Sequence, residues 1–453
     1  MPALRGRALR AVLARGGRRR VRHAGLSCAG VPGTAALGAG ARGFRLRRRN
    51  GDVSSAAGRS KVDLARQCVR QLNPWSEIVR LEADVATLTP AMFNGIDVAL
   101  CTLDSPRGRL LGARLLLAAR VPFVDAGALA EQWLARCTVA DPTGRRGDPG
   151  AEPSCPICGW SREMLARSGE DLGFPCASVL DTGEGAASTL TSGQRAAGLA
   201  VREALALAGV VGLRPSVGRE IREDLRSLRV ESFRVPFEPG CAADHVLAGE
   251  DRVQLDHAPV EVRVSDLART CRLEPEDTIV LATSELVHIA VCRQCREVAR
   301  PLRRIGSPRL TCSRCGAPLV PVRRARRVRW AEAAASVGHA SAADWFEPGD
   351  AFAVEGRGGA RVYRFPAPPL AWEPGAAWHD ETARPRFRRL PSDYDLDAVR
   401  RTRVAFLGLG HVGSAALQQL APLPFAGFLL VDRDRIEEHN LPSSSLPVED
   451  PRP

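Results

Sequence analysis

Three glycines near the carboxy-terminal end, Gly408, Gly410 and Gly413, form a GxGxxG turn. The apolar run VAFL (404–407) precedes the turn, and a helical pattern follows it. Asp432 ends the next expected strand. In this arrangement bare backbone amides and a helix amino-terminus hold phosphate, and the acid holds ribose hydroxyls. The pattern predicts a nucleotide site on a Rossmann-like, doubly wound α/β sheet; a packing turn without nucleotide is the alternative.

Short apolar runs elsewhere in the chain indicate further strands. They fall at 78–84, 97–102 and 122–127, and the segment 108–120 between the last two has a helical pattern. Strand, helix and strand at this spacing predict parallel βαβ units.

Lys61 is the only lysine among the 64 basic residues, and it falls in the first turn of an expected helix. Ser60 and Asp63 resemble a capping box at the start of that helix. A cation in this position opposes the helix dipole at a cost of roughly 0.3 kcal/mol or more. Either a bound phosphate removes this conflict, or the lysine is solvated at a helix end. The helix is expected to have one apolar face, made by Val62, Ala65, Val69 and Leu72.

Asp104 follows the expected strand 97–102, in the turn CTLDSPRGR. The carboxyl ends of parallel strands are where such sheets bind ligands, and a carboxylate there could hold Mg²⁺ through water. An ordinary turn aspartate is the alternative.

The formal net charge of +13 resides at the start of the chain. Residues 1–51 contain 13 arginines and no acidic residue, so the other 402 residues carry 51 basic and 51 acidic side chains. This neutral body argues against an extended nucleic-acid-binding surface across the fold. We expect residues 1–44 to be a disordered basic leader, with a transit peptide or a misplaced start codon as alternatives. The absence of an apolar run of about 18 residues predicts no membrane span.

Six of the 13 cysteines fall in CxxC pairs, which indicates metal binding in a reducing compartment, and we expect the cytoplasm. The spacing CxxC-x16-CxxC predicts a tetrahedral structural Zn²⁺ site in a zinc ribbon over 292–315. Its ligands would be Cys292, Cys295, Cys312 and Cys315.

The third pair, Cys155 and Cys158, needs two more ligands for metal binding. It is otherwise a redox pair or a remnant, and the sequence does not say whether it shares a zinc with a ribbon pair. Cys176 is a lone cysteine whose simplest interpretation is a buried, inert thiol. No histidine falls in a recognisable metal or triad motif.

Two separated segments resemble the ThiF/MoeB-type, ubiquitin-activating-enzyme-like adenylyltransferases. The carboxy-terminal segment PRFRRLPSDYDLDAVRRTRVAFLGLGHVGSAALQQL…GFLLVDRDRIEEHNL (385–441) is similar to the start of the family domain. That start has an Arg-aromatic-x-Arg motif, GxGxxG, D-x-D and Asn-Leu-x-Arg. The matching residues here are Arg386 to Arg389, the three glycines, Asp432 with Asp434, and Asn440 with Leu441. The arginine after Asn-Leu is missing.

The continuation of the family domain resembles residues 45–75, near the amino-terminus. Arg48 falls where the missing arginine belongs, and Lys61 takes the place of the catalytic lysine. Asp104 matches a strand-end Asp-Asn motif, although Ser105 replaces the asparagine. Cys155 and Cys158 are similar to the first zinc pair of the family. Cys176 falls near a cysteine that carries a thioester or persulfide in some members.

The two halves therefore occur in reversed order. A circular permutation, two partial domains that complement each other between subunits, and a gene-assembly error all fit this order. The corresponding division of the chain is a leader, a carboxy-terminal half-domain, a β-rich segment with the ribbon, and an amino-terminal half-domain. Their bounds are 1–44, 45–215, 216–383 and 384–453.

The resemblance implies an enzyme that uses ATP and Mg²⁺ to adenylate the carboxy-terminal carboxylate of a ubiquitin-like or sulfur-carrier protein ending in Gly-Gly. It implies that Asp432 binds the ribose and Asp104 positions Mg²⁺. It also implies that phosphate charge is neutralised by Arg48, Lys61 and, from the second subunit of a homodimer, Arg389. Cys176 would then accept the acyl group.

Two other classes of function fit parts of the sequence. A zinc-ribbon interaction protein with a degenerate nucleotide fold would bind Zn²⁺ and a partner without turning over ATP. An NAD-dependent oxidoreductase would use the glycine turn, but it leaves Lys61, Asp104 and Arg389 without a role.

Overall fold

The computed structural model describes residues 58–129, 132–147, 153–169, 189–210, 212–305, 307, 310–337, 340–391, 394–437 and 444–446. All of them belong to one compact unit, which spans 49–453. Arg48, Cys176, Asn440 and the leader lie outside the described residues, so the expectations about them remain predictions. No helix in the described ranges combines the length and apolarity needed to cross a bilayer.

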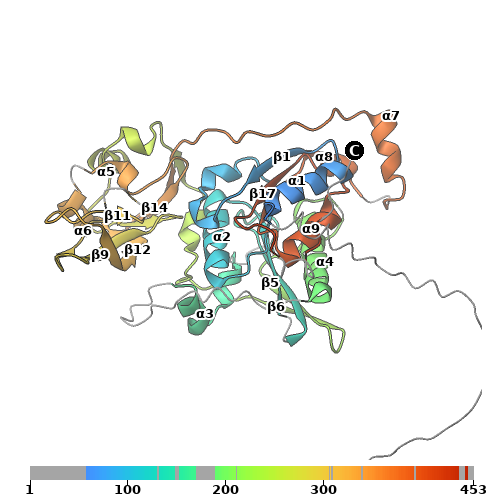
Figure 1. The fold of residues 1–453 in the computed structure, drawn as a ribbon, viewed down its shortest axis with the longest axis horizontal. Helices are drawn as coiled ribbons and strands as arrows, with labels where there is room; N and C mark the ends of the chain where they lie inside the picture. The colour runs from blue at the N-terminus through green and yellow to red at the C-terminus, as the bar shows by residue number, and fades with distance from the viewer. Residues whose placement is uncertain are drawn as a thin grey trace, which may run out of the picture. The chain divides into compact units, whose positions relative to one another are not determined.

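An eight-stranded sheet forms the centre of the fold (Figure 1), with the strand order β1-β17-β16-β2-β3-β4-β5-β6. The five strands from β1 to β3 are parallel, and the three that follow pair antiparallel. The predicted α/β class is confirmed. The strands are β1 (Glu77–Leu81), β2 (Val98–Cys101), β3 (Phe123–Leu129), β4 (Leu134–Ala140), β5 (Arg219–Asp224), β6 (Arg229–Arg234), β16 (Arg403–Leu407) and β17 (Gly427–Val431).

Strands from the two ends of the chain pair directly with each other. Glu77 of β1 pairs with Gly427 of β17, and Val98 of β2 pairs with Val404 of β16. β16 and β17 thus lie between β1 and β2 within a single chain. Both are short apolar runs that are almost completely buried, as is typical of central parallel strands. The sheet also continues past residue 215 into β5 and β6.

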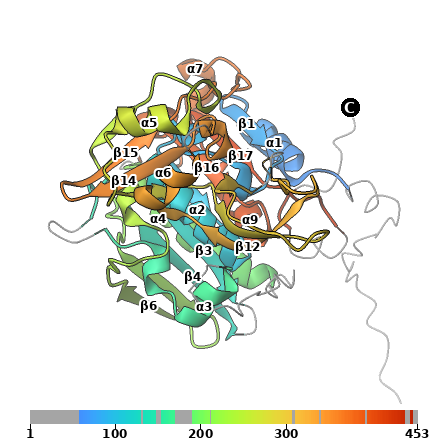
Figure 2. The same cartoon turned by 90° about the vertical axis from the view of Figure 1, so that its left-hand side faces the viewer.

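Helices cover both faces of the parallel strands. Leu110, Leu115 and Leu116 of α2 pack on one face, against Ala99 and Leu407. On the other face three helices pack against Val98, Phe406 and Phe428 (Figures 1 and 2). This is the doubly wound arrangement that the sequence predicts. The helices are α2 (Pro106–Ala119) on the first face, and α1 (Lys61–Leu72), α4 (Leu190–Leu207) and α9 (His411–Leu420) on the second.

Helix α1 starts at Lys61, as expected, but the predicted capping box is wrong. The side chain of Ser60 makes no cap hydrogen bond, and its buried Oγ has no partner among the described residues. Asp63 instead forms an ion pair with Arg80 on β1. An available partner on the neighbouring strand thus replaces the local cap.

A second, five-stranded sheet and a four-stranded ribbon sheet are built from the middle of the chain. The five-stranded order is β13-β8-β14-β15-β7, and β14 and β15 form an antiparallel hairpin. Its elements are β7 (Arg252–Gln254), α5 (Val264–Cys271), β8 (Thr278–Leu281), β13 (Arg327–Arg329), α6 (Trp330–Val337), β14 (Ala351–Gly356) and β15 (Gly359–Arg364). The ribbon strands are β9 (Leu286–Cys292), β10 (Val298–Ala299), β11 (Arg303–Arg304) and β12 (Leu319–Ala325).

The segment 366–391 returns the chain to the main sheet along the outer edge of β1. Glu373 exchanges two backbone hydrogen bonds with Ile78, at 3.0 and 2.8 Å, so it occupies the edge that β1 leaves open. The rings of Trp75, Trp378 and Phe387 then form an aromatic cluster. Two short helices follow before β16, α7 (Asp380–Ala383) and α8 (Leu396–Arg401).

Candidate active site and metal centres

The glycine turn joins β16 to α9 at the carboxyl edge of the parallel strands. Gly408 has φ +93°, a left-handed conformation that favours glycine, and its amide donates to Val431 O at 2.9 Å. A Cβ on Gly413 would lie 2.1 Å from the carbonyl oxygen of Gly408, so only glycine lets α9 approach the turn this closely. A Cβ on Gly410 would meet no atom within 4 Å. Gly410 is the residue that caps α9, and its surroundings leave room for a ligand.

Asp432, just beyond β17, fixes the turn from the adjacent strand. One carboxylate oxygen accepts the Leu409 amide at 2.5 Å and the other accepts the Asp434 amide at 2.7 Å. Burial raises the pKa of Asp432, while the nearby Lys61 ammonium acts in the opposite direction. The acid expected at the ribose position therefore lies against the glycine turn.

Lys61 lies at the same edge of the sheet, although it comes from the amino-terminal part of the chain. Its side chain is 9% exposed, and Nζ lies 3.1 Å from a carboxylate oxygen of Asp434. The Lys61 amide donates to Asp434 O at 3.1 Å, and this contact aligns the start of α1 with the segment after β17. The amino-termini of α1 and α9 and the Lys61 ammonium thus lie near Asp432 at one edge of the sheet, and each of these groups favours an anion.

Asp104 lies at the end of β2, in the turn before α2. Ser105 caps this helix by accepting the Gly108 amide at 3.1 Å, which leaves the Asp104 side chain exposed. Asp104 contributes to raising the pKa of Arg433, although the ion pair of Arg433 with Asp84 is the main cause. Asp104 is therefore near the Asp432–Asp434 segment, and no described contact holds its carboxylate away from a cation.

Arg389 does not reach this edge within its own chain. It is exposed, in a segment where Arg386 donates to Leu72 O at 3.3 Å and stacks 5.0 Å from the Trp75 ring centroid. Leu72 and Lys61 are the two ends of α1, about 18 Å apart along a 12-residue helix. The contact of Arg389 with phosphate from a second subunit, which the resemblance implies, therefore remains a prediction.

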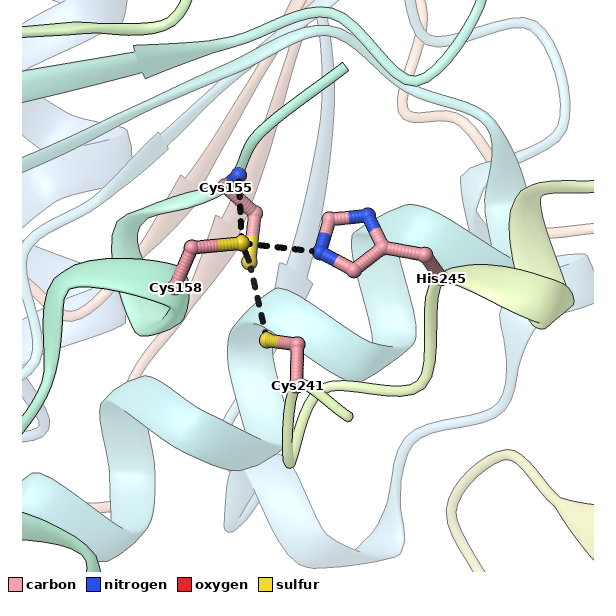
Figure 3. Close-up of side chains that lie close together, drawn as sticks. All are labelled: Cys155, Cys158, Cys241 and His245. Atoms are coloured by element: carbon pink, nitrogen blue, oxygen red, sulfur yellow. Dashed lines mark hydrogen bonds between the residues drawn. The ribbon is translucent and has the colours of Figure 1, made fainter. Parts of the chain in front are cut away.

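Cys155 and Cys158 meet two residues that the sequence patterns do not single out, Cys241 and His245 (Figure 3). The Cys158 sulfur lies 3.1 Å from His245 Nε2, and the Cys155 sulfur lies 3.7 Å from that of Cys241. All four ligand atoms lie within 4.8 Å of one another, and Cys155 and Cys241 are buried. Three thiols and an imidazole at this spacing fit a tetrahedral Zn²⁺ site.

The protonation of these thiols also fits a cation site. Hydrogen bonds from Cys155 and Cys241 lower the pKa of Cys158 far below its ordinary value, whereas burial raises the pKa of Cys155. The neighbouring thiols stabilise one thiolate. A divalent cation bound here would stabilise the other thiols as thiolates as well.

The loop that carries Cys241 and His245 is held by arginines on two sides. Arg114 of α2 donates to Ala242 O at 2.9 and 2.8 Å. Arg326 donates to the same oxygen at 3.2 Å and pairs with the buried carboxylate of Asp244, as does Arg327. This loop therefore joins the main sheet to the five-stranded sheet, since β13 begins at Arg327.

The four ribbon cysteines converge as the spacing predicts. The Cys292 sulfur lies 3.4 Å from that of Cys315, and the Cys295 sulfur lies 3.5 Å from that of Cys312. A hydrogen bond from the Cys295 amide is the main reason that the pKa of Cys292 falls to about 6. Thiolate character near neutral pH suits Zn²⁺ binding. The two cysteine centres are separate, so Cys155 and Cys158 share no metal with the ribbon.

The glycine turn, Asp432 and Asp434 lie in one continuous segment of the sequence, and this segment matches a known family. Residues 384–449 match the ThiF family. The ThiF match also contains Arg389, whereas Lys61, Asp104 and all eight metal-ligand candidates lie outside it. A search of curated proteins gave no match.

Solved structures of E. coli MccB are among those similar to this chain. MccB with succinimide is 15% identical with a TM-score of 0.24, covering 32% of this chain and 39% of MccB. MccB with ATP is 16% identical with a TM-score of 0.23 and the same coverage. MccB with MccA-N7isoASN is 14% identical with a TM-score of 0.24, covering 32% and 40%. The chain thus spans about two fifths of the length of these MccB structures.

Two ligand candidates were missed because no paired motif marks them. Cys241 and His245 form a C-x3-H pair in the sequence CAADH, 86 residues or more beyond Cys155. This weak local spacing is the signal that the sequence offers, and it does not distinguish His245 from the other histidines. The ThiF-matching segment, by contrast, was recognisable because its turn, helix and acid are contiguous.

Proposed function

We propose that this protein is an ATP-dependent adenylyltransferase that activates the carboxy-terminal carboxylate of a ubiquitin-like or sulfur-carrier protein. The observation that carries the proposal is the meeting of Lys61, the ThiF-matching glycine turn and Asp432 at one edge of the parallel strands. A phosphate-binding turn and a ribose-binding acid fit a nucleotide. A nearly buried lysine beside two helix amino-termini fits the charge of its phosphates.

In the proposed reaction a carboxylate oxygen attacks the α-phosphorus of ATP. A new oxygen–phosphorus bond forms, the bond from the α-phosphorus to the bridging oxygen breaks, and pyrophosphate leaves. The product is an acyl-adenylate. Catalysis of this kind rests on positioning and on neutralising charge, with no group of the protein becoming covalently bound.

Each residue then has a defined task. The amides of the glycine turn and α9 hold phosphate, and Asp432 accepts hydrogen bonds from the ribose. Lys61 leaves Asp434 to neutralise charge on the phosphates, and Asp104, with Asp434, would hold Mg²⁺, which screens those charges. Arg389 would come from the second subunit of a homodimer. As the resemblance implies, Arg48 would neutralise phosphate charge, Asn440 would contact the nucleotide and Cys176 would accept the acyl group.

The sheet topology supports a circular permutation as the explanation of the reversed order. β16 and β17 pair with β1 and β2 of the same chain, and the segment 366–391 connects the middle of the chain back to the sheet. In a permuted domain one chain would supply both halves. Peptide mapping of an expressed product of the expected mass, with both termini confirmed, tests this order against a gene-assembly error.

The activity is tested by ATP–pyrophosphate exchange with a panel of small proteins ending in Gly-Gly. We expect exchange that requires one of them and that falls at least 100-fold in Lys61→Ala. Gln71→Ala, on the exposed far end of α1, is the matched control. Exchange that Lys61→Ala leaves unchanged would overturn the assigned role. Bound NAD instead of AMP would favour an oxidoreductase, and zinc and partner binding without exchange would favour an interaction protein.

A further inference from the structure

The neutral average of the body conceals a strongly cationic segment. Residues 286–329, from the start of β9 to the end of β13, contain 12 arginines and a single acidic residue, Glu297. The chain as a whole has 51 acidic residues in 453, so near-absence of acid over this stretch is a local property. The zinc ribbon and its flank therefore carry a local excess of 11 positive charges (12 − 1), which acidic residues elsewhere in the body balance.

Three of these arginines lie in the two turns that carry the ribbon cysteines. Arg293 and Arg296 each follow a cysteine of the first pair, and Arg314 precedes Cys315 of the second. The four sulfurs lie within 4.8 Å of one another, so the two turns that carry these arginines are adjacent. Of the three, Arg314 lies 3.7 Å from the carboxylate of Glu297, the single acidic residue of the segment.

Most of the arginines in this segment face solvent. The exposed ones are Arg293, Arg296, Arg300, Arg314, Arg323, Arg324, Arg327 and Arg329. Within the described ranges no ion pair involves Arg293, Arg296, Arg300 or Arg329. This set differs from Arg326, which is buried against Asp244 and serves the packing of the fold.

We propose that this ribbon surface binds nucleic acid through its phosphate backbone. Guanidinium groups match phosphate in charge and geometry, and a row of regularly spaced phosphates can satisfy many of them at once. The segment 286–329 has no Phe, Tyr or Trp, so it offers no platform for stacking on bases. The aromatic anchors of protein interfaces are equally absent, and protein interfaces are depleted of charge at their centres. None of these arginines belongs to the strands, helices or turns at the edge of the main sheet where Lys61 and the glycine turn lie.

The test uses the full-length protein and fluorescence anisotropy with short labelled DNA and RNA duplexes over a range of salt concentrations. The test variant replaces Arg293, Arg296, Arg300 and Arg329 by Gln. The matched control replaces four exposed arginines elsewhere, Arg145, Arg162, Arg229 and Arg401. Both variants keep the arginine-rich leader, so their difference reports on the ribbon alone. Zinc content and circular dichroism establish that each variant retains its fold.

We expect the test variant to bind at least tenfold more weakly than wild type, and the control to stay within about twofold. Each lost phosphate contact lowers the slope of log K against log salt by about 0.9 for a DNA duplex, so the slope should fall by up to about 3.6. Equal binding by the two variants would overturn the proposal. Competition by poly-glutamate as strong as by nucleic acid would also overturn it, since it would indicate an acidic protein partner.

Discussion

The ammonium of Lys61 lies 3.1 Å from a carboxylate oxygen of Asp434, although 373 residues separate the two in the chain. Lys61 begins α1 in the segment 45–215, and Asp434 follows β17 in the segment 384–453. Their contact joins the two halves at the edge where the glycine turn lies. It also fixes the Lys61 ammonium beside the segment that follows β17.

Replacing Lys61 by Ala should affect nucleotide binding far more than stability. Asp434 is half-exposed, and an ion pair with an exposed partner contributes only about 0–1 kcal/mol. We expect a change of less than about 1 kcal/mol in the free energy of unfolding and at least a tenfold loss of ATP affinity. Thermal unfolding and titration calorimetry measure the two quantities, with Gln71→Ala as control. A large loss of stability with unchanged ATP affinity would assign Lys61 a structural role.

Two glycines of the same turn should respond differently to alanine. Gly413→Ala forces a methyl group against the Gly408 carbonyl, and overpacking of this kind costs about 1–3 kcal/mol or more. Gly410→Ala meets no atom within 4 Å, so the fold should retain its stability. If phosphate approaches Gly410, the alanine there nevertheless weakens ATP binding. Normal ATP affinity in a stable Gly410→Ala protein would argue against phosphate at this turn.

Asp432 should make stability depend on pH in a defined direction. Its pKa is raised by burial, so the carboxyl binds its proton more tightly in the folded than in the unfolded chain. Ionisation therefore costs the folded state. Its contribution to the unfolding free energy falls as pH rises from about 3.9, the unfolded value, to the raised pKa. Subtracting the pH profile of Asp432→Asn from that of wild type isolates this slope. A difference profile that is flat or rises with pH would contradict a raised pKa of Asp432.

Zinc stoichiometry should report the two cysteine centres separately. We expect two Zn²⁺ ions per chain, and one in Cys241→Ser or in His245→Ala, because each removes a ligand of the same four. Cys68→Ser, at a buried cysteine of α1 outside both centres, should retain two. Elemental analysis by mass spectrometry gives the count. Two ions in all three variants would mean that Cys241 and His245 are not ligands.

Arg389 should act across subunits. Arg389→Ala and Lys61→Ala are each expected to lower exchange at least 100-fold when assayed alone. Mixed dimers of the two variants contain one site with both wild-type residues, so mixing should restore a substantial part of the activity. Arg388→Ala, at the exposed neighbouring position, serves as a control that should remain active alone. No recovery on mixing, with dimers demonstrated, would place Arg389 outside the reaction.

The local features of the candidate nucleotide site and of the ribbon metal centre could be predicted from the sequence. The glycine turn, its flanking strand and helix, and the acid after the next strand depend on contiguous residues. Lys61 at the start of its helix followed from the apolar periodicity of 61–72. The ribbon centre followed from two CxxC pairs, because each pair fixes two thiolates within a single turn. The capping box at Ser60 failed because Asp63 has a better partner on β1.

The long-range pairings were decided by the tertiary structure. The sequence by itself determined which segments become strands, which glycine turn joins a strand to a helix and which cysteines pair locally. Only the sheet order brings Lys61 beside Asp434, and only the return of the chain through β5 and β6 brings Cys241 and His245 to Cys155 and Cys158. The physical reason is that backbone propensity and side-chain spacing act over a few residues. Which distant strands become neighbours depends instead on burying both faces of one sheet.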